Sequence, residues 1–218
     1  MTLRATLRQS LFIAGTDTGV GKTWVAVRLL HALGADGLRT AAMKPVAAGA
    51  DSSPHGLRNE DATTLMDAAN VAIPYSAVNP CCFAAPTSPH LAAAREGRQI
   101  DLAAIKRSFS RIIPNCDAII VEGAGGWFAP IGDPSVPGTS GPTMEDVALV
   151  LGLPVLLVVG LKLGCLSHAL LTAAAVRQAG LPLAGWVANP IDPEFPDHAD
   201  YIRALELRIP APRWVIPA

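Results

Sequence analysis

The sequence lacks an excess of charge of either sign, because it contains 17 Lys and Arg residues and 18 Asp and Glu residues. A formal net charge of −1 gives no global field that would attract nucleic acid or an anionic membrane. Charged residues make up only 16% of the chain, against roughly 25% in an average soluble domain. Half of the residues are hydrophobic, enough to bury a sizeable core and to exclude a disordered chain. The length predicts one domain over residues 1–218.

The chain also lacks a disulfide framework and a membrane span. Its four cysteines, Cys81, Cys82, Cys116 and Cys165, form no C-x-x-C pair, which favours a reducing cytoplasm. The apolar run over residues 147–161 falls short of the ~18 residues that indicate a membrane span, and a Gly-Leu-Pro sequence interrupts it. Residues 11–14 are too few for the apolar core of an export signal. We therefore expect a soluble cytoplasmic protein that binds neither membrane nor nucleic acid.

Short apolar runs, continuous rather than alternating, recur along the chain with helical segments between them. The expected strands cover residues 11–14, 40–43, 118–121, 155–159 and 184–188, and the clearest expected helices cover residues 23–33, 102–112, 144–151 and 167–179. Continuous apolar strands indicate a parallel sheet buried on both faces. The alternation predicts an α/β fold with a doubly wound, mostly parallel sheet and helices on both faces. Ligands bind beyond the carboxyl ends of such strands, so functional residues should follow the strands directly.

The strongest motif follows the first expected strand, where residues 15–23 read GTDTGVGKT. A glycine-rich loop between a strand and a helix lets backbone N–H groups converge on a phosphate, and the helix N-terminus adds partial positive charge. Lys22 can then reach the β- and γ-phosphates of a nucleotide, and the Thr23 hydroxyl can bind Mg²⁺. Thr16 stands where the usual pattern has its first glycine, with Gly15 one residue earlier.

Other candidate residues stand at the ends of later strands. Glu122 ends the 118–121 strand and precedes glycines, a place that suits a second Mg²⁺ contact. Lys44 follows the 40–43 strand and could neutralise charge on a transferring phosphoryl group. Asp61 stands at the expected start of a helix, where the residue pattern by itself favours an N-cap or first-turn acid over a ligand.

Together these motifs resemble the dethiobiotin synthetase family of the P-loop NTPase superfamily. Further matching segments are residues 44–47, 59–62, 79–80, 86–90, 121–128, 158–165 and 185–189. They occur in the family's order from residue 11 to about residue 190, which covers most of the chain. The phosphate loop alone would indicate only the superfamily, whereas the ordered set is specific.

The resemblance implies an ATP-dependent ligase that makes dethiobiotin in biotin biosynthesis. In this reaction 7,8-diaminononanoate takes up CO₂ as a carbamate, and the carbamate attacks the γ-phosphate of ATP. The resulting carbamic–phosphoric anhydride closes to a ureido ring as the second amine expels phosphate. No protein nucleophile is required, so positioning and charge neutralisation carry the catalysis.

The resemblance also implies roles for individual residues. Mg²⁺ would be bound by Thr23, Asp61 and Glu122, and the carbamate and γ-phosphate would be held by Lys22 and Lys44 with Thr18 nearby. Nucleotide contacts would come from Gly19, Val20, Gly21, Lys22, Thr23, Trp24, Asp61, Glu122, Gly123, Ala124, Gly125, Asn189, Pro190 and Pro217. A homodimer is implied, in which the substrate carboxylate meets Gly164, Cys165 and Ser167 across the interface.

Three features depart from the family pattern. Ala48 stands where the family has a substrate-contacting serine, so one hydroxyl contact worth about 0.5–1.5 kcal/mol is missing. Ser167 replaces a cross-subunit asparagine, which would make the carboxylate contact shorter or water-mediated. The chain ends at Ala218 without the family's usual helical tail, and relaxed nucleotide selectivity is the expectation from this.

Three other functions are compatible with a phosphate loop. An amide-forming synthase of the same superfamily would need an ammonia source, for which 218 residues leave little room. A nucleotide switch of the ParA type would carry a second lysine where this chain has Asp17, and a membrane-bound one would carry a basic amphipathic helix. A small-molecule kinase would be expected to carry an arginine-bearing lid, and residues 133–142 contain no arginine.

Overall fold

A six-stranded parallel sheet forms the centre of the protein, seen in a computed structural model that describes residues 10–135, 137–139 and 141–216. The strands are β1 (Leu11–Gly15), β2 (Thr40–Met43), β7 (Ala118–Glu122), β8 (Val155–Leu161), β9 (Leu183–Pro190) and β10 (Arg213–Trp214). Their order is β10-β9-β8-β1-β7-β2, and every neighbouring pair is parallel. The predicted α/β fold is confirmed, and the first three predicted strands match within one residue.

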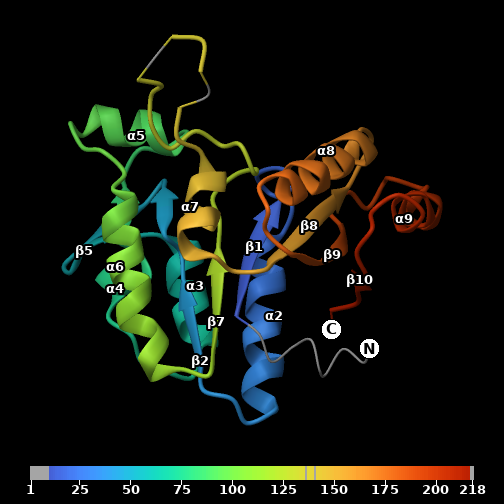
Figure 1. The fold of residues 1–218 in the computed structure, drawn as a ribbon. Coiled ribbons are helices and arrows are strands. Elements are labelled where there is room, and N and C mark those ends of the chain that lie inside the picture. Colours follow the sequence, from blue (N-terminus) through green and yellow to red (C-terminus); the bar gives the residue numbers. More distant parts are fainter. Residues whose placement is uncertain (1–9, 136, 140, 217–218) are drawn as a thin grey trace.

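Helices cover both faces of this sheet (Figure 1). One face packs against α2 (Lys22–Ala35) and α3 (Glu60–Ala68), and the other against α6 (Leu102–Ile112), α7 (Met144–Leu151), α8 (Cys165–Gln178) and α9 (His198–Glu206). Along β1, Leu11 and Ile13 point into the first layer while Phe12 and Ala14 point into the second. All four side chains are buried, so the strand reads as a continuous apolar run.

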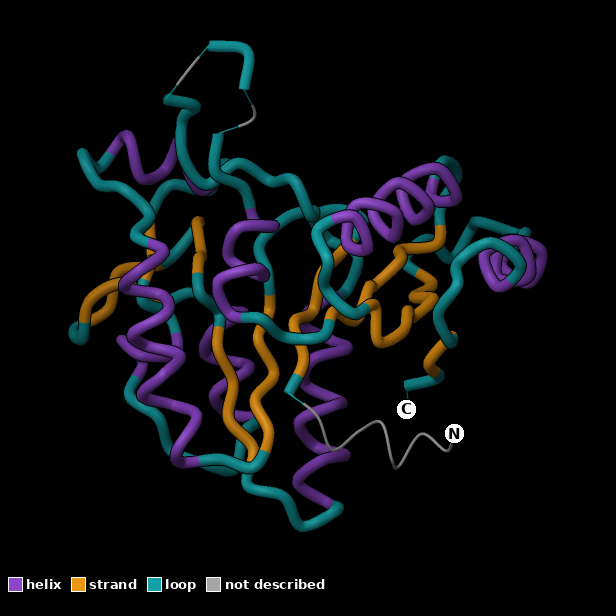
Figure 2. The backbone as a smooth tube through the Cα atoms, viewed as in Figure 1, coloured by secondary structure: helices purple, strands orange, loops and turns teal. Residues whose placement is uncertain are grey.

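Several short elements, which the sequence did not predict, lie near the end of β2. They are the parallel pair β3 (Val46–Ala48) and β6 (Cys81–Phe83), the hairpin of β4 (Asp51–Ser53) and β5 (Gly56–Arg58), and the helices α4 (Tyr75–Val78) and α5 (Pro89–Arg95). Figure 2 shows these strands as short segments separate from the central sheet. Their three-residue strands carry too little hydrophobic pattern to be recognised from sequence.

The register of the central strands brings together the strand ends at which functional residues were expected. β1 pairs with β7 through Ile13 opposite Glu122, and β2 pairs with β7 through Met43 opposite Val121. The residues that follow β1, β2 and β7 therefore meet at one edge of the sheet. Within the part of the chain that the structure describes, every helix is too short or too polar to cross a membrane.

Candidate functional site

The phosphate loop joins β1 to α2 and depends on two glycines with positive φ. Gly19 has φ 73° and Gly21 has φ 86°, in the left-handed region that residues with a Cβ rarely adopt. Gly21 is the N-cap of α2, so the first helical N–H groups point toward the loop without a capping side chain. Asn189, at the end of β9, donates from its amide nitrogen to the Val20 carbonyl at 2.8 Å and ties the loop to the sheet.

Lys22 lies folded inside this loop rather than on the surface. Its ammonium donates to the Asp17 carbonyl at 2.9 Å, and the residue is only 6% exposed. Burial, together with repulsion from Lys44, lowers the pKa of Lys22 to about 8. The Asp17 carboxylate accepts from the Thr18 N–H at 2.7 Å and from the Lys162 ammonium at 3.1 Å. These bonds arrange the loop around a space that suits an anion.

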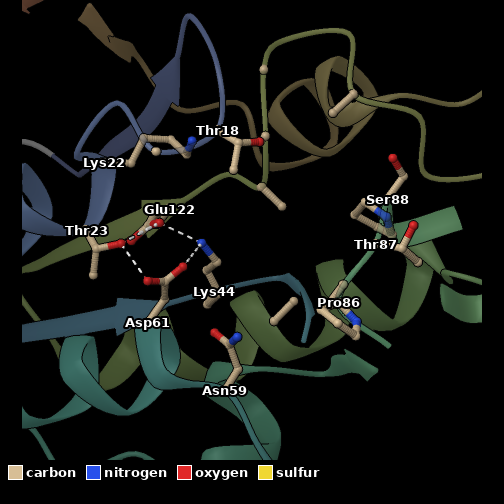
Figure 3. Close-up of a pocket in the computed structure, with 18 of the residues that line it drawn as sticks. Thr18, Lys22, Thr23, Lys44, Asn59, Asp61, Pro86, Thr87, Ser88 and Glu122 are labelled. Carbon is tan, nitrogen blue, oxygen red and sulfur yellow. Dashed lines mark hydrogen bonds and ion pairs between the residues drawn. The ribbon is translucent and has the colours of Figure 1, made fainter. Parts of the chain in front are cut away.

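Four polar side chains, one each from α2, α3, β7 and the residue after β2, converge beside the loop (Figure 3). The Thr23 hydroxyl lies 2.9 Å from an Asp61 oxygen and 3.0 Å from Glu122 Oε1. The Lys44 ammonium donates to Glu122 Oε1 at 2.6 Å, to Asp61 at 2.9 Å and to the Gly123 carbonyl at 3.4 Å. The three predicted Mg²⁺ ligands therefore form one hydrogen-bonded cluster with Lys44.

Lys44 and Asp61 are both stabilised in their ionised forms within this cluster. Burial alone would lower the pKa of Lys44, but attraction to Glu122 and Asp61 outweighs it and leaves that pKa raised. Burial alone would raise the pKa of Asp61, but Lys44 and the Thr23 hydroxyl leave it lowered. Lys44 is 4% exposed and Glu122 is 1% exposed, so water screens this ion pair little.

The oxygen atoms of the cluster fit a hydrated divalent cation. Thr23 has one hydroxyl hydrogen and faces two carboxylate oxygens, so it can donate to only one of them. The second carboxylate oxygen of Glu122, Oε2, is buried and has no hydrogen-bond partner. Among the described residues no group of three His, Cys, Asp or Glu side chains could hold a metal. A hydroxyl with one or two carboxylates suits Mg²⁺, which keeps several waters or phosphate oxygens as its other ligands.

Asp61 reaches the cluster because of how α3 begins. Asn59 is the N-cap of this helix, and its side chain accepts from the Ala62 N–H at 3.3 Å. Asp61 stands in the first turn, where a negative charge is stabilised by the helix dipole. The sequence expectation of a first-turn acid is confirmed, and the same side chain also faces Lys44 and Thr23.

A cavity of about 800 Å³ opens over the cluster. The predicted residues that line it are Thr18, Gly19, Gly21, Lys22, Thr23, Lys44, Ala48, Asp61, Glu122, Ala124 and Gly125. Sequence reasoning assigned no role to the other lining residues, which are Ala47, Asn59, Pro86, Thr87, Ser88, Pro89, Gly126, Ala129 and Pro130. Thr87 and Ser88 lie across the pocket from the cluster in Figure 3, and the family-like segment at residues 86–90 was the signal for them.

The remaining predicted residues lie outside the lining of this cavity. Val20, Trp24 and Gly123 are sequence neighbours of residues that line the cavity. Asn189 and Pro190 are the last two residues of β9. Gly164, Cys165 and Ser167 lie at the start of α8. Helix α8 begins at Cys165, two residues before the predicted start, because Gly164 with φ 90° forms its N-cap. Pro217 lies outside the described residues.

This combination of fold and site defines a P-loop nucleotide-binding protein: a parallel sheet, a glycine loop opening a helix, and an acid at the tip of the neighbouring strand. Similar folds occur in the ParA family ATPase from Chlorobium tepidum TLS (TM-score 0.55, 14% identity, 94% of this chain and 84% of that one). A chain of the MinC:MinD cell division complex from Aquifex aeolicus gives a TM-score of 0.53 at 15% identity, over 94% of this chain and 79% of that one. These likenesses concern the fold alone.

Comparison with sequence relatives identifies the family, which the fold comparison does not. The family model described as AAA domain matches residues 9–212. The ATP-dependent dethiobiotin synthetase BioD 1 of Escherichia coli O157:H7 is 47% identical over 201 residues, which cover 92% of this chain and 86% of that protein. The ATP-dependent dethiobiotin synthetase BioD of Vibrio vulnificus strain YJ016 is 48% identical over 207 residues, 95% of this chain and 88% of that protein. The chain belongs to the dethiobiotin synthetase family.

Replacing Lys44 tests whether the buried ion pair behaves as the geometry indicates. In the absence of nucleotide and Mg²⁺, Lys44→Met should lower the free energy of unfolding by about 3 kcal/mol, because it leaves the Glu122 carboxylate buried without a cation. Urea unfolding measures this difference. The double variant Lys44→Met with Glu122→Gln is the control and should recover about half of the loss or more, since it removes both charges. A double variant less stable than the single one would contradict this account.

Proposed function

We propose that this protein catalyses the ATP-dependent conversion of 7,8-diaminononanoate and CO₂ to dethiobiotin, ADP and phosphate, a ligase step of biotin biosynthesis. The observation that carries the proposal is the cluster of Thr23, Lys44, Asp61 and Glu122 beside the phosphate loop, in a chain 47% identical to a dethiobiotin synthetase. We further propose that residues 1–218 act as one domain in the cytoplasm. The cysteines, which are all free, suit that compartment.

The reaction needs positioned charges more than a protein nucleophile. One amine of the substrate adds to CO₂ and loses a proton, which gives a carbamate. A carbamate oxygen then attacks the γ-phosphorus of ATP, the bond to the β-phosphate oxygen breaks, and ADP leaves. The second amine attacks the carbamoyl carbon, phosphate leaves, and the ureido ring closes with loss of a second proton. The substrate thus supplies the nucleophile at all three steps.

Lys22 and Lys44 are the residues that we assign to neutralising the transferring phosphoryl group and the carbamate. Lys44 has three N–H bonds, and all three have acceptors in the protein. Contact with a phosphoryl oxygen therefore requires Lys44 to give up at least one of these bonds. Among the described residues the Lys22 ammonium donates to the Asp17 carbonyl alone, which leaves two of its N–H bonds for the same purpose. Thr18, which also lines the cavity, adds its hydroxyl beside them.

Thr23, Asp61 and Glu122 are the residues that would hold Mg²⁺. When bound, this ion neutralises negative charge on the nucleotide phosphates. The unpartnered Oε2 of Glu122 and the shared hydroxyl of Thr23 support this assignment. The same cluster keeps Asp61 ionised at neutral pH, because its pKa is already lowered in the protein.

The remaining nucleotide and substrate contacts follow the position of each residue. We assign the phosphates and ribose to Gly19, Val20, Gly21, Trp24, Gly123, Ala124 and Gly125, and the adenine to Asn189, Pro190 and Pro217. Asn189 already bonds to the loop at the Val20 carbonyl, which supports a place beside the nucleotide. Ala48 lines the cavity beside Lys44 and would meet the carbon chain of the substrate.

Omitting one reactant at a time tests the proposed reaction. Phosphate release should require ATP, Mg²⁺, bicarbonate and 7,8-diaminononanoate together, and mass spectrometry should detect dethiobiotin. Phosphate release that needs neither the diamine nor bicarbonate would contradict the proposal.

Lys44→Ala should lower kcat at least about a hundredfold, because it removes a charge that faces the phosphoryl group.

Replacing Asp61 tests the proposed metal ligands. Asp61→Asn should raise the Mg²⁺ concentration for half-maximal activity about tenfold or more, since a neutral amide is a weaker ligand than a carboxylate. Glu60→Gln is the matched control, because Glu60 stands one residue away on α3 with its side chain exposed. Equal Mg²⁺ requirements in the two variants would exclude Asp61 as a ligand.

We also propose a homodimer in which the start of α8 from one subunit meets the substrate carboxylate in the other. Gly164 caps this helix without a side-chain bond. The Cys165 N–H donates to the Lys162 carbonyl at 3.1 Å, so the next N–H groups, those of Leu166 and Ser167, are the ones available for an anion. The apolar side chains of Leu163 and Leu171 are 80% and 68% exposed on this segment. Exposed apolar side chains gathered on one element are typical of an interface.

A charge placed on α8 tests the dimer. Leu171→Asp should convert the protein from dimer to monomer in sedimentation velocity, because a buried unpaired carboxylate opposes association. Leu207→Asp is the control, since Leu207 is 75% exposed just beyond α9 and lies outside the proposed interface. A Leu171→Asp protein that still sediments as a dimer would contradict the proposed surface.

A further inference from the structure

A hydrogen-bonded relay outside the cavity connects the backbones that carry Lys44 and Asp61. The Tyr75 hydroxyl, at the start of α4, accepts from the Asn59 N–H at 2.8 Å. The same hydroxyl donates to the Asn79 side-chain carbonyl at 3.0 Å. The Asn79 amide nitrogen then donates to the Lys44 carbonyl at 2.6 Å. Neither Tyr75 nor Asn79 lines the cavity, so neither is placed to touch a ligand bound there.

At Lys44, the relay supplies backbone hydrogen bonds that the central sheet does not provide. Strand β2 ends at Met43, so the Lys44 carbonyl has no strand partner and takes its hydrogen bond from Asn79. The Lys44 N–H donates to the Val78 carbonyl at 2.9 Å, so α4 and its C-cap hold both backbone groups of this residue. Asn79 is 3% exposed, and a buried amide with both ends paired holds one orientation.

The Asp61 end of the relay fixes the first turn of α3. Asn59 is 8% exposed and caps this helix through the Ala62 N–H and the Thr63 N–H. Its own N–H has the Tyr75 hydroxyl as partner, so that hydroxyl positions the cap and the turn that carries Asp61. The Arg58 guanidinium packs over the Tyr75 ring at 4.0 Å and holds the ring in place.

We infer that Tyr75 and Asn79 are positioning residues, which set the separation between the Lys44 ammonium and the Asp61 carboxylate across 17 residues of sequence. The inference rests on the roles proposed above for Lys44 and Asp61. One oxygen atom, the Tyr75 hydroxyl, joins the two branches, because it is the acceptor for one and the donor for the other.

Tyr75→Phe removes this oxygen and keeps the ring under Arg58. It should lower kcat about tenfold, because small displacements of phosphoryl-neutralising groups are costly in rate. It should also weaken Mn²⁺ binding in the presence of ADP about fivefold, measured by electron paramagnetic resonance, because Asp61 loses its fixed place. Tyr201→Phe is the matched control and should leave both values within about twofold. Tyr201 lies on α9, far along the chain, where its ring packs against that of Phe195.

A double-mutant cycle separates positioning from general stability. In the Asp61→Asn background, Tyr75→Phe should lower the rate less than about twofold, because the Asp61 carboxylate, one of the two groups whose separation it sets, is already lost. The same tenfold loss in both backgrounds would overturn the inference, and so would unchanged kcat and Mn²⁺ binding in the single variant. If Tyr75→Phe does not fold, Asn79→Asp gives the same test, because an ionised carboxylate cannot donate to the Lys44 carbonyl.

The two readouts also separate this inference from the proposed function. A wild-type protein that makes no dethiobiotin, while Tyr75→Phe still weakens Mn²⁺ binding, would overturn the function and support the positioning role. Wild-type synthesis of dethiobiotin, together with Mn²⁺ binding that Tyr75→Phe leaves unchanged, would overturn the positioning role alone.

Discussion

The buried ion pair between Lys44 and Glu122 is the interaction on which the site depends. A carboxylate that is 1% exposed at the tip of β7 is costly to bury, and it is stable there because an ammonium lies 2.6 Å away. The pairing of β2 with β7 brings the two groups to the same edge of the sheet. Asp61 and Thr23 then join a charge arrangement that the parallel strands have already fixed, and the cavity opens directly above it.

The sequence predicted the central fold well because its strands are buried on both faces. The run over residues 11–14 became β1, and the helix expected from residue 23 became α2, which begins one residue earlier. Between β2 and α6 only the start of α3 was predicted, since β3, β4, β5 and β6 have three residues each and part of this segment is exposed. Pattern recognition needs longer periodic stretches than these.

The site was predictable where chemistry follows a strand end and less so where it depends on tertiary contacts. Lys22, Thr23, Lys44 and Glu122 were all identified from their places after strands, and the structure brings them together. Asp61 needed the family resemblance, because its pattern alone indicates only a helix start. The Tyr75 relay could not be predicted, since its hydrogen bonds join α4 to segments 16 residues upstream and 4 residues downstream through side-chain geometry.

The position of β1 between β7 and β8 also bears on how the protein folds. Leu11 pairs with Ile120, and Phe12 pairs with both Val121 and Val155, so the central strand finds its neighbours more than 100 residues away. Contacts of such sequence separation make folding slow, because the intervening loops must close before the contacts form. During synthesis, β1 and the glycine loop leave the ribosome long before β7 supplies Glu122. The chain can therefore acquire its binding cluster only late, as a product of the completed sheet.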